Sequence, residues 1–229
     1  IVNPEEKGLA LYRAYRERKT VQPFPVGETE WREIYSAFTS RIVKEEGLCG
    51  YKIAFTSPNS LKKYGLDEPA VGVITCEMVD DVSIPFKYSY LEVEVIAEVE
   101  DCSPSQECVK GYYLGLEIPS TRFDAPLGSL STYQLLADNA IAWRVVKGVR
   151  VPSPDLEVKL EVNGEHKGSG RGTYVFGDVN GMISWLAKKV GRFSGLIATG
   201  AILGPIQVKP RDRVRVTSQN AELEVVLKG

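Results

Sequence analysis

The sequence predicts an α+β fold, with a helical N-terminal part packed on a β-rich body. Apolar residues recur at helical spacing from Trp31 to Ile42, whereas short alternating apolar runs separated by turns predominate after Val71. The 229 residues, 43% of them hydrophobic, suffice for one large domain, or for one domain with a smaller appendage. We therefore expect an N-terminal α/β part over residues 1–70 and a β-rich body over residues 71–229.

Two helices are expected near the N-terminus. Asn3 is a helix-capping residue and Pro4 suits the first helical position, so the first helix should run to about Arg18. Thr29 can cap a second helix, which Gly47 is suited to end.

The rest of the chain alternates short strands with a few helices. The Asn163-Gly164 pair, which two-residue hairpin turns prefer, predicts a hairpin after the strand at 158–162. Helices are expected at 57–64, 131–146 and 180–190, and strands at 50–55, 71–75, 90–99, 158–162, 174–176, around 208, at 214–217 and at 223–227.

Three glutamates in two apolar segments form the candidate functional site. In a strand, Glu92 and Glu94 point the same way, roughly 7 Å apart, because successive side chains alternate faces. Glu117 lies in a second apolar segment, where an unpaired carboxylate is costly. Converging carboxylates suit a hard divalent cation such as Mg²⁺ or Mn²⁺. The alternative is a solvated acidic face, which Glu98 and Glu100 would continue.

Composition argues against several classes of function. The formal net charge of −2 lacks the basic excess of a nucleic-acid-binding protein. No apolar run is long enough to span a membrane. The single histidine, His166, and four cysteines without a Cys-x-x-Cys pair do not supply a zinc site, so any metal site should consist of oxygen ligands. We expect reduced cysteines and a cytoplasmic protein.

Six motifs follow one another between about residue 45 and the C-terminus. The first is Gly50-Tyr51-Lys52-Ile53-Ala54-Phe55-Thr56-Ser57-Pro58, which resembles the pattern G-x-K-[IV]-G-x-T-x-P. The others are Glu68–Val73, the Glu92-x-Glu94 pair with Leu116–Ile118, Leu136–Ala140, Gly168–Gly172 with Trp185–Ala187, and Thr199–Gly200 with Gly204–Pro205. Together they resemble the 2-keto-4-pentenoate hydratase family of the fumarylacetoacetase-like superfamily, which also contains 4-oxalocrotonate decarboxylase.

The resemblance implies a fold and a reaction. The fold would be a mixed-sheet roll of the fumarylacetoacetase C-terminal-domain type. The reaction would be addition of water to a 2-hydroxy-2,4-dienoate or 2-oxo-enoate through a metal-stabilised enolate, in the breakdown of aromatic compounds. In that pattern Glu92, Glu94 and Glu117 hold the Mg²⁺ or Mn²⁺ ion.

Five further residues receive roles from the resemblance. Lys52 would contact the substrate carboxylate or enolate, or shuttle a proton, whereas on sequence alone it is a lysine at the protein surface. Glu77, in place of the family aspartate, would be the general acid/base, with a surface acid near a turn as the alternative. Ser169, Thr199 and Asp138 would bind the substrate, and the alternative for Asp138 is a buried structural network.

Departures from the family pattern leave the reaction open. Glu77 replaces an aspartate, Ala54 replaces a glycine, and Gly177-Asp178-Val179 replaces a G-H-P turn. The alternatives are a 4-oxalocrotonate-type decarboxylase, an isomerase or acylpyruvate-type hydrolase, and a non-catalytic partner subunit. No surplus of arginines marks a second carboxylate pocket, which favours a small mono-acid substrate. We expect a homo-oligomer, with a decarboxylase or aldolase of the same pathway as a possible partner.

Overall fold

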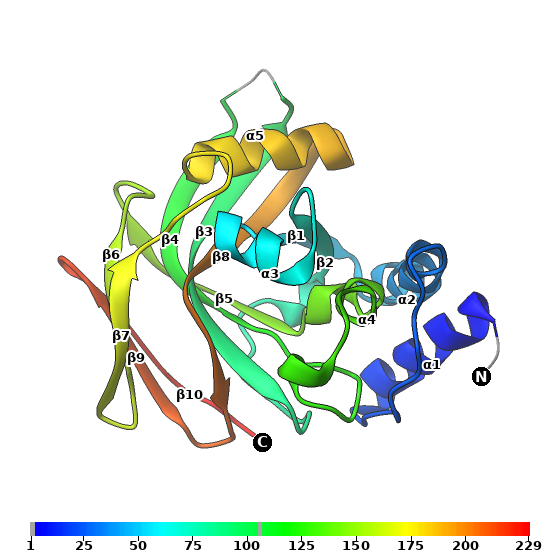
Figure 1. Ribbon diagram of the computed structural model, residues 1–229. Coiled ribbons are helices and arrows are strands. Elements are labelled where there is room, and N and C mark those ends of the chain that lie inside the picture. The colour runs from blue at the N-terminus through cyan, green and yellow to red at the C-terminus, as the bar shows by residue number, and fades with distance from the viewer. Residues whose placement is uncertain (1–2, 105–106) are drawn as a thin grey trace.

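The computed structural model describes residues 3–104 and 107–229, and it confirms the α+β class (Figure 1). Helices α1 (Pro4–Glu17) and α2 (Trp31–Glu46) precede the first strand, as expected. Asn3 caps α1, since the Glu6 N–H donates to its side-chain oxygen over 2.9 Å. Gly47 ends α2 with a positive φ of 81°, a backbone conformation that glycine adopts without strain.

A six-stranded mixed sheet forms the centre of the molecule, in the order β2-β1-β8-β3-β4-β5. Neighbouring strands are antiparallel except for β1 and β8, which are parallel. This sheet contains strands from both sides of the boundary expected at residue 70, because β1, from the expected N-terminal part, lies between β2 and β8. Its strands are β1 (Leu48–Ala54), β2 (Ala70–Thr75), β3 (Ser89–Cys102), β4 (Val109–Ile118), β5 (Arg144–Val151) and β8 (Phe193–Val208).

A second, four-stranded antiparallel sheet has the order β10-β9-β6-β7 and flanks the first (Figure 1). Its hairpin at Asn163-Gly164 is confirmed, since β6 and β7 pair on either side of that turn. Its strands are β6 (Glu157–Val162), β7 (Glu165–Arg171), β9 (Arg213–Ser218) and β10 (Ala221–Val226).

In the described part of the chain, three further helices and three 3₁₀ turns connect the strands. Helix α5 packs against β8, and α4 packs against α2. The helices are α3 (Pro58–Tyr64), α4 (Thr132–Ala137) and α5 (Val179–Val190), and the turns are η1 (Cys76–Met78), η2 (Leu127–Ser129) and η3 (Asn139–Ile141). No helix in the described ranges is long and apolar enough to cross a membrane.

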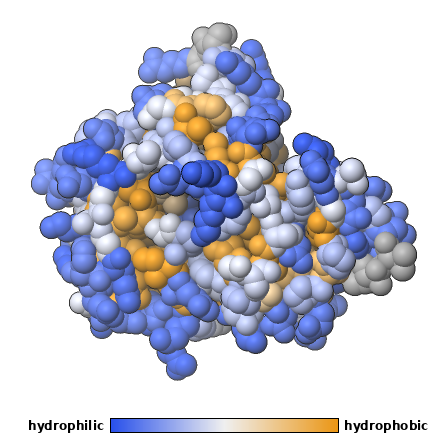
Figure 2. All heavy atoms as spheres, in the orientation of Figure 1, coloured by the Kyte–Doolittle hydropathy of each residue, from blue (hydrophilic) through white to orange (hydrophobic). Residues whose placement is uncertain are grey.

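The core lies along β3, where alternation separates an apolar face from the face that carries the glutamates. Leu91, Val93, Val95, Ala97 and Val99 are all buried. On the face of the molecule seen in Figure 2, hydrophobic residues form several patches around a hydrophilic strip near the centre, and hydrophilic residues cover most of the periphery.

Three expected elements differ from the structure in their bounds or in their form. The helix expected over 131–146 ends at Ala137, and the chain enters β5 at Arg144. Between them Asn139, Ala140 and Ile141 have φ values of 56°, 49° and 51°, which no right-handed helix accommodates. The strand expected at 174–176 is a single bridge between Tyr174 and Gly177, whereas the long strand β8 was expected only around residue 208.

The expectation of reduced cysteines is wrong. The structure pairs Cys49 with Cys76 and Cys102 with Cys108 in disulfides. Antiparallel pairing of β1 with β2 puts Leu48 opposite Thr75, so two cysteines 27 positions apart in the chain become neighbours. The cysteines therefore no longer support a cytoplasmic location.

Candidate metal centre

The three predicted carboxylates lie together on neighbouring strands. Glu92 is directly opposite Glu117 in the antiparallel pairing of β3 with β4, and Glu94 is opposite Gly115. One ligand oxygen from each of Glu92, Glu94 and Glu117 falls within 4.8 Å of the others. Glu94 and Glu117 are each 1% exposed and Glu92 is half-buried, so this cluster is not a solvated acidic face.

Lys52 of β1 lies against this carboxylate cluster and is itself 3% exposed. Its Nζ donates to Glu117 Oε2 over 2.6 Å and to the Ala140 backbone oxygen over 2.8 Å. An ammonium group has three N–H donors, so one remains for a group in the adjoining cavity. The surface-lysine alternative is therefore excluded, and Lys52 is a buried cation paired with one of the three glutamates.

Backbone geometry holds Glu94 from its other side. The Gly200 N–H donates to Glu94 Oε1 over 3.0 Å. Gly200 has a φ of 117°, and a Cβ there would lie 2.3 Å from Thr56 Oγ1, so only glycine fits this position. The sequence drew attention to Thr199-Gly200 but not to this backbone donor.

Burial and mutual repulsion perturb the acids of the cluster. Burial, followed by the charge of Glu117, raises the pKa of Glu92 to about 7. The same two causes, with the charge of Glu92 in addition, raise the pKa of Glu94 well above its ordinary value. Burial lowers the pKa of Lys52, but the charges of Glu117, Glu92 and Glu94 outweigh it and raise the pKa overall. Without a cation, the three carboxylates repel one another, and this repulsion together with burial favours protonation of Glu92 and Glu94.

The donor set fits a divalent cation. Glu117 Oε1 is buried and has no hydrogen-bond partner in the described part of the chain. A buried carboxylate oxygen without a partner is costly, and a metal ion would satisfy it. Three carboxylates supply only oxygen ligands, which Mg²⁺ and Mn²⁺ prefer.

A cavity of about 180 Å³ opens beside Glu92 and Lys52. Most of its wall is apolar, and Tyr64 adds a phenol. Burial and the charge of Glu92 raise the pKa of Tyr64, so its hydroxyl keeps its proton at neutral pH. The remaining lining residues are Ile53, Ala54, Phe55, Thr56, Ser57, Ser60, Pro119, Leu127, Leu135, Ala140, Ile141, Ala201, Gly204 and Pro205.

Two residues near the cluster did not stand out in the sequence. Tyr64 belongs to the short helix α3, and nothing in its surroundings in the chain marks it as a cavity residue. The Tyr174 hydroxyl is buried and has no hydrogen-bond partner among the described residues, and the charge of Glu94 adds to burial in raising its pKa. Both lie in segments brought to the cluster by tertiary contacts, which strand or helix periodicity does not reveal.

The structure does not bring Glu77 to the carboxylate cluster. Glu77 follows β2 in the 3₁₀ turn η1, and its side chain is 62% exposed. It lines a separate surface depression with Arg16 and Arg144, and its carboxylate lies 3.9 Å from Arg16 Nη1. This placement corrects the expectation of a buried general acid/base beside the metal.

The three expected substrate-binding residues are placed in three different ways. Ser169 is exposed on β7 and does not line the cavity. Asp138 is fully buried and binds Arg122, with Arg122 Nε donating to Asp138 Oδ1 over 2.7 Å, so the structural alternative holds for it. Thr199 is buried next to Gly200, but its hydroxyl donates to the Val95 backbone oxygen over 2.7 Å.

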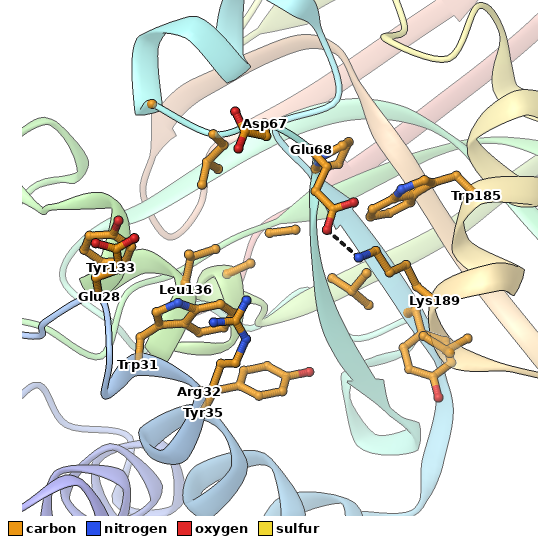
Figure 3. A pocket seen from close by; sticks show the side chains of 18 residues that line it. Glu28, Trp31, Arg32, Tyr35, Asp67, Glu68, Tyr133, Leu136, Trp185 and Lys189 are labelled. Carbon is orange, nitrogen blue, oxygen red and sulfur yellow. Dashed lines mark hydrogen bonds and ion pairs between the residues drawn. The ribbon is translucent and has the colours of Figure 1, made fainter.

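A larger groove of about 800 Å³ shares Ala140 with the carboxylate cavity. None of the three clustered glutamates lines it. Figure 3 shows Trp31, Arg32 and Tyr35 of α2 along one side and Trp185 and Lys189 of α5 on the other. The Lys189 ammonium forms an ion pair with Glu68 in this groove. Because its lining does not include the three glutamates, the groove is distinct from the metal centre.

Solved structures share this architecture. 4-Oxalocrotonate decarboxylase from Pseudomonas putida G7, solved with calcium and acetate and with magnesium and adipate, matches with a TM-score of 0.81 at 18% identity. In the calcium complex the match covers 98% of this chain and 96% of that one. Fumarylpyruvate hydrolase from Pseudomonas aeruginosa with Mn²⁺ and pyruvate matches at 0.58 and 18% identity, over 79% of this chain and 89% of that one.

A third match is a fumarylacetoacetate hydrolase family protein from Yersinia pestis CO92, with a TM-score of 0.60 and 14% identity over 79% of this chain and 93% of that one. No family model matches the sequence. The architecture shared with these structures shows that the chain has the fumarylacetoacetase-like fold.

Proposed function

We propose that this protein is a divalent-metal-dependent hydratase that adds water to a short 2-hydroxy-2,4-dienoate or the corresponding 2-oxo-enoate. The observation that carries the proposal is the cluster of Glu92, Glu94 and Glu117, paired with the buried Lys52 and open to a small cavity. The ion would be Mg²⁺ or Mn²⁺, both of which prefer oxygen ligands.

Charge balance supports the assignment. When all three carboxylates are ionised, they and the Lys52 ammonium leave a net charge of −2 in a largely buried volume. A divalent cation would neutralise that charge, and it would supply Lewis-acid stabilisation of the negative charge that develops on the 2-oxo oxygen. Glu92, Glu94 and Glu117 would hold the ion.

Lys52 and Tyr64 have the chemistry for the remaining steps. The unused N–H of Lys52 can hydrogen-bond the substrate carboxylate or the developing enolate oxygen. Tyr64 lines the same cavity, and its protonated hydroxyl is our candidate for donating a proton towards the substrate carbon chain.

The cavity favours a mono-acid. Lys52 is the only arginine or lysine among its described lining residues, and two of its three N–H donors are already used. A dicarboxylate would find no second cation for its distal carboxylate, and hydrogen bonds from Thr56, Ser57, Ser60 or Tyr64 would be less favourable than an ion pair. A short dienoate with one carboxylate avoids that cost.

The solved structures agree with the general chemistry. The decarboxylase was solved with calcium and acetate and with magnesium and adipate, which is a dicarboxylate, and the hydrolase was solved with Mn²⁺ and pyruvate. These are properties of those proteins, and they support a site for a divalent cation and a carboxylic acid here.

Decarboxylation of a 2-oxo acid is the second candidate. It is favoured by the full-length likeness to the decarboxylase, and by the absence of Glu77 from the cavity. Loss of carbon dioxide from a metal-bound 2-oxo acid would need the same charge stabilisation, but no base to activate water.

An ultraviolet assay distinguishes these reactions. Chelator-stripped protein is mixed with fresh 2-hydroxypenta-2,4-dienoate, with and without Mg²⁺ or Mn²⁺. We expect metal-dependent loss of the dienol absorbance, with 4-hydroxy-2-oxopentanoate as the product. Release of carbon dioxide from 4-oxalocrotonate, with no turnover of the dienoate, would replace the hydratase by the decarboxylase.

A matched pair of variants assigns the turnover to this site. Glu94→Gln should abolish activity, because it removes a charged ligand while its amide oxygen can still accept from the Gly200 N–H. Glu100→Gln, an exposed change on the same strand, should retain it. Equal activity in the two variants would contradict the site assignment.

A further inference from the structure

The turn from Asn139 to Ile141 is unusual because three successive non-glycine residues have positive φ values of 56°, 49° and 51°. L-residues other than glycine and asparagine rarely adopt this conformation, and Ile141 is β-branched, which makes it less favourable still. Such strain persists only where the surroundings over-determine it, and it is concentrated at functional sites.

Arg122 forms hydrogen bonds to the backbone at both ends of the turn. Its guanidinium is fully buried and donates to the backbone oxygens of Asp138 and Ala142, over 2.7 Å in each case. Its Nε also donates to the Asp138 carboxylate over 2.7 Å. One side chain thus bridges the residue before the turn and the residue after it.

The Asn139 side chain forms hydrogen bonds that attach the turn to β2, at the edge of the central sheet. Its side-chain oxygen accepts from the Val73 N–H over 2.8 Å, and its side-chain amide donates to the Val73 backbone oxygen over 3.0 Å. Because β2 is the last strand on this side of the sheet, the Asn139 amide takes the place of a neighbouring strand for one residue.

The turn places one backbone oxygen, that of Ala140, beside Lys52 at the metal centre. The Ala140 oxygen accepts from Lys52 Nζ over 2.8 Å, while the same Nζ binds Glu117 over 2.6 Å. Gly72, which pairs with Lys52 across the strands, leaves the space for this approach. A Cβ at Gly72 would lie 2.7 Å from the Asn139 backbone oxygen and 2.9 Å from Lys52 Cγ. The contacts therefore run without a gap from Asn139 through Ala140 and Lys52 to Glu117.

We propose that Asn139 is a positioning residue, which holds the Ala140 carbonyl against Lys52 and so keeps the ammonium on Glu117 in the geometry that the metal and the substrate require. Its significance for turnover rests on the proposed function. Its effect on the carboxylate cluster does not, because a bound metal ion reports that geometry without any substrate. Partners that orient a metal site from behind its ligands typically contribute about 10–100-fold to metal affinity or activity.

The test compares Asn139→Ala with Asn163→Ala. Asn163 is a matched control, because it also has a positive φ, 54°, and its side chain also accepts from a backbone N–H, that of Arg213. It lies in the hairpin turn between β6 and β7, away from the metal centre. Each chelator-stripped variant is loaded with Mn²⁺, and its dissociation constant and its electron paramagnetic resonance spectrum are recorded. Steady-state kcat and KM for the dienoate are then measured.

For Asn139→Ala we expect a changed Mn²⁺ spectrum and a fall in kcat of about 10–100-fold with a much smaller change in KM. Asn163→Ala should match the wild type in its Mn²⁺ spectrum and in its kcat and KM. Asn139→Asp, which keeps the acceptor for the Val73 N–H, should recover part of the loss. If the wild type does not turn over the dienoate, the proposed function fails, and the Mn²⁺ spectrum and affinity alone decide the positioning role.

A wild-type Mn²⁺ spectrum and affinity in folded Asn139→Ala would overturn the proposal. So would changes no larger than those of Asn163→Ala. If Asn139→Ala does not fold, Asn139→Gly decides by the same measurements, because glycine tolerates the left-handed backbone and lacks only the side chain.

Discussion

Replacement of Lys52 by methionine probes the buried pair at the centre of the site. Lys52 and Glu117 are 3% and 1% exposed, and their charged atoms lie 2.6 Å apart. Methionine retains most of the volume of the lysine stem but leaves three neighbouring carboxylates without a cation. Removing one partner of a buried ion pair costs about 3–5 kcal/mol, because the other charge stays buried and uncompensated.

That free energy converts into a measurable change in melting temperature. An unfolding entropy of about 2.1 cal/mol/K per residue gives about 0.48 kcal/mol/K for the 229-residue chain. A loss of about 3–5 kcal/mol therefore predicts a melting temperature about 6–10 °C lower for Lys52→Met.

The assay is calorimetric or optical melting in chelator, repeated on Glu117→Gln and on the double variant. Because the two side chains are partners, the double variant should lose less stability than the two single losses combined. Additive losses, or a single-variant loss below about 1 kcal/mol, would refute the reasoning that the pair is buried and coupled.

Three further predictions concern the disulfide, the protonation of the site and Glu77. Cys49→Ala/Cys76→Ala should lower the free energy of unfolding by about 3.5 kcal/mol, as expected for a cross-link spanning 27 residues, and a loss below about 1 kcal/mol in non-reducing urea denaturation would contradict this. Because the pKa of Glu92 rises from 4.5 unfolded to about 7 folded, the metal-free protein should lose stability, and Mn²⁺ should bind more tightly, as the pH rises through that window. Denaturation in chelator and Mn²⁺ titrations at several pH values measure both trends, and flat profiles would disagree. Glu77→Gln should keep kcat/KM within about twofold of wild type, because its exposed side chain lies outside the carboxylate cluster. A tenfold loss in the dienoate assay would show instead that Glu77 takes part in catalysis.

The carboxylate cluster was predictable in part from local rules and in part from the resemblance to a known family, which grouped Glu117 with Glu92 and Glu94. Strand alternation places Glu92 and Glu94 on one face, and an apolar setting makes an unpaired Glu117 costly. The N-terminal helices were predictable from local rules, since capping residues and helical spacing act over a few positions.

The rest of the site depends on contacts between distant segments. The Ala140 carbonyl reaches Lys52 through a left-handed turn that helical propensity around Leu135 cannot anticipate, and the segment was therefore expected to be a longer helix. The Gly200 N–H is a backbone donor, so no side chain reveals it. Glu77 was assigned from its position in a motif, but the chain turns into η1 there and leaves its side chain exposed.

Isothermal titration of Mn²⁺ into the metal-free protein tests the central claim most directly. We expect one ion per chain for the wild type and for Glu100→Gln, and no measurable binding for Glu94→Gln, which lacks one of the three charged ligands. Failure of the wild type to bind Mn²⁺, or undiminished binding by Glu94→Gln, would contradict the assignment of Glu92, Glu94 and Glu117 as a metal centre.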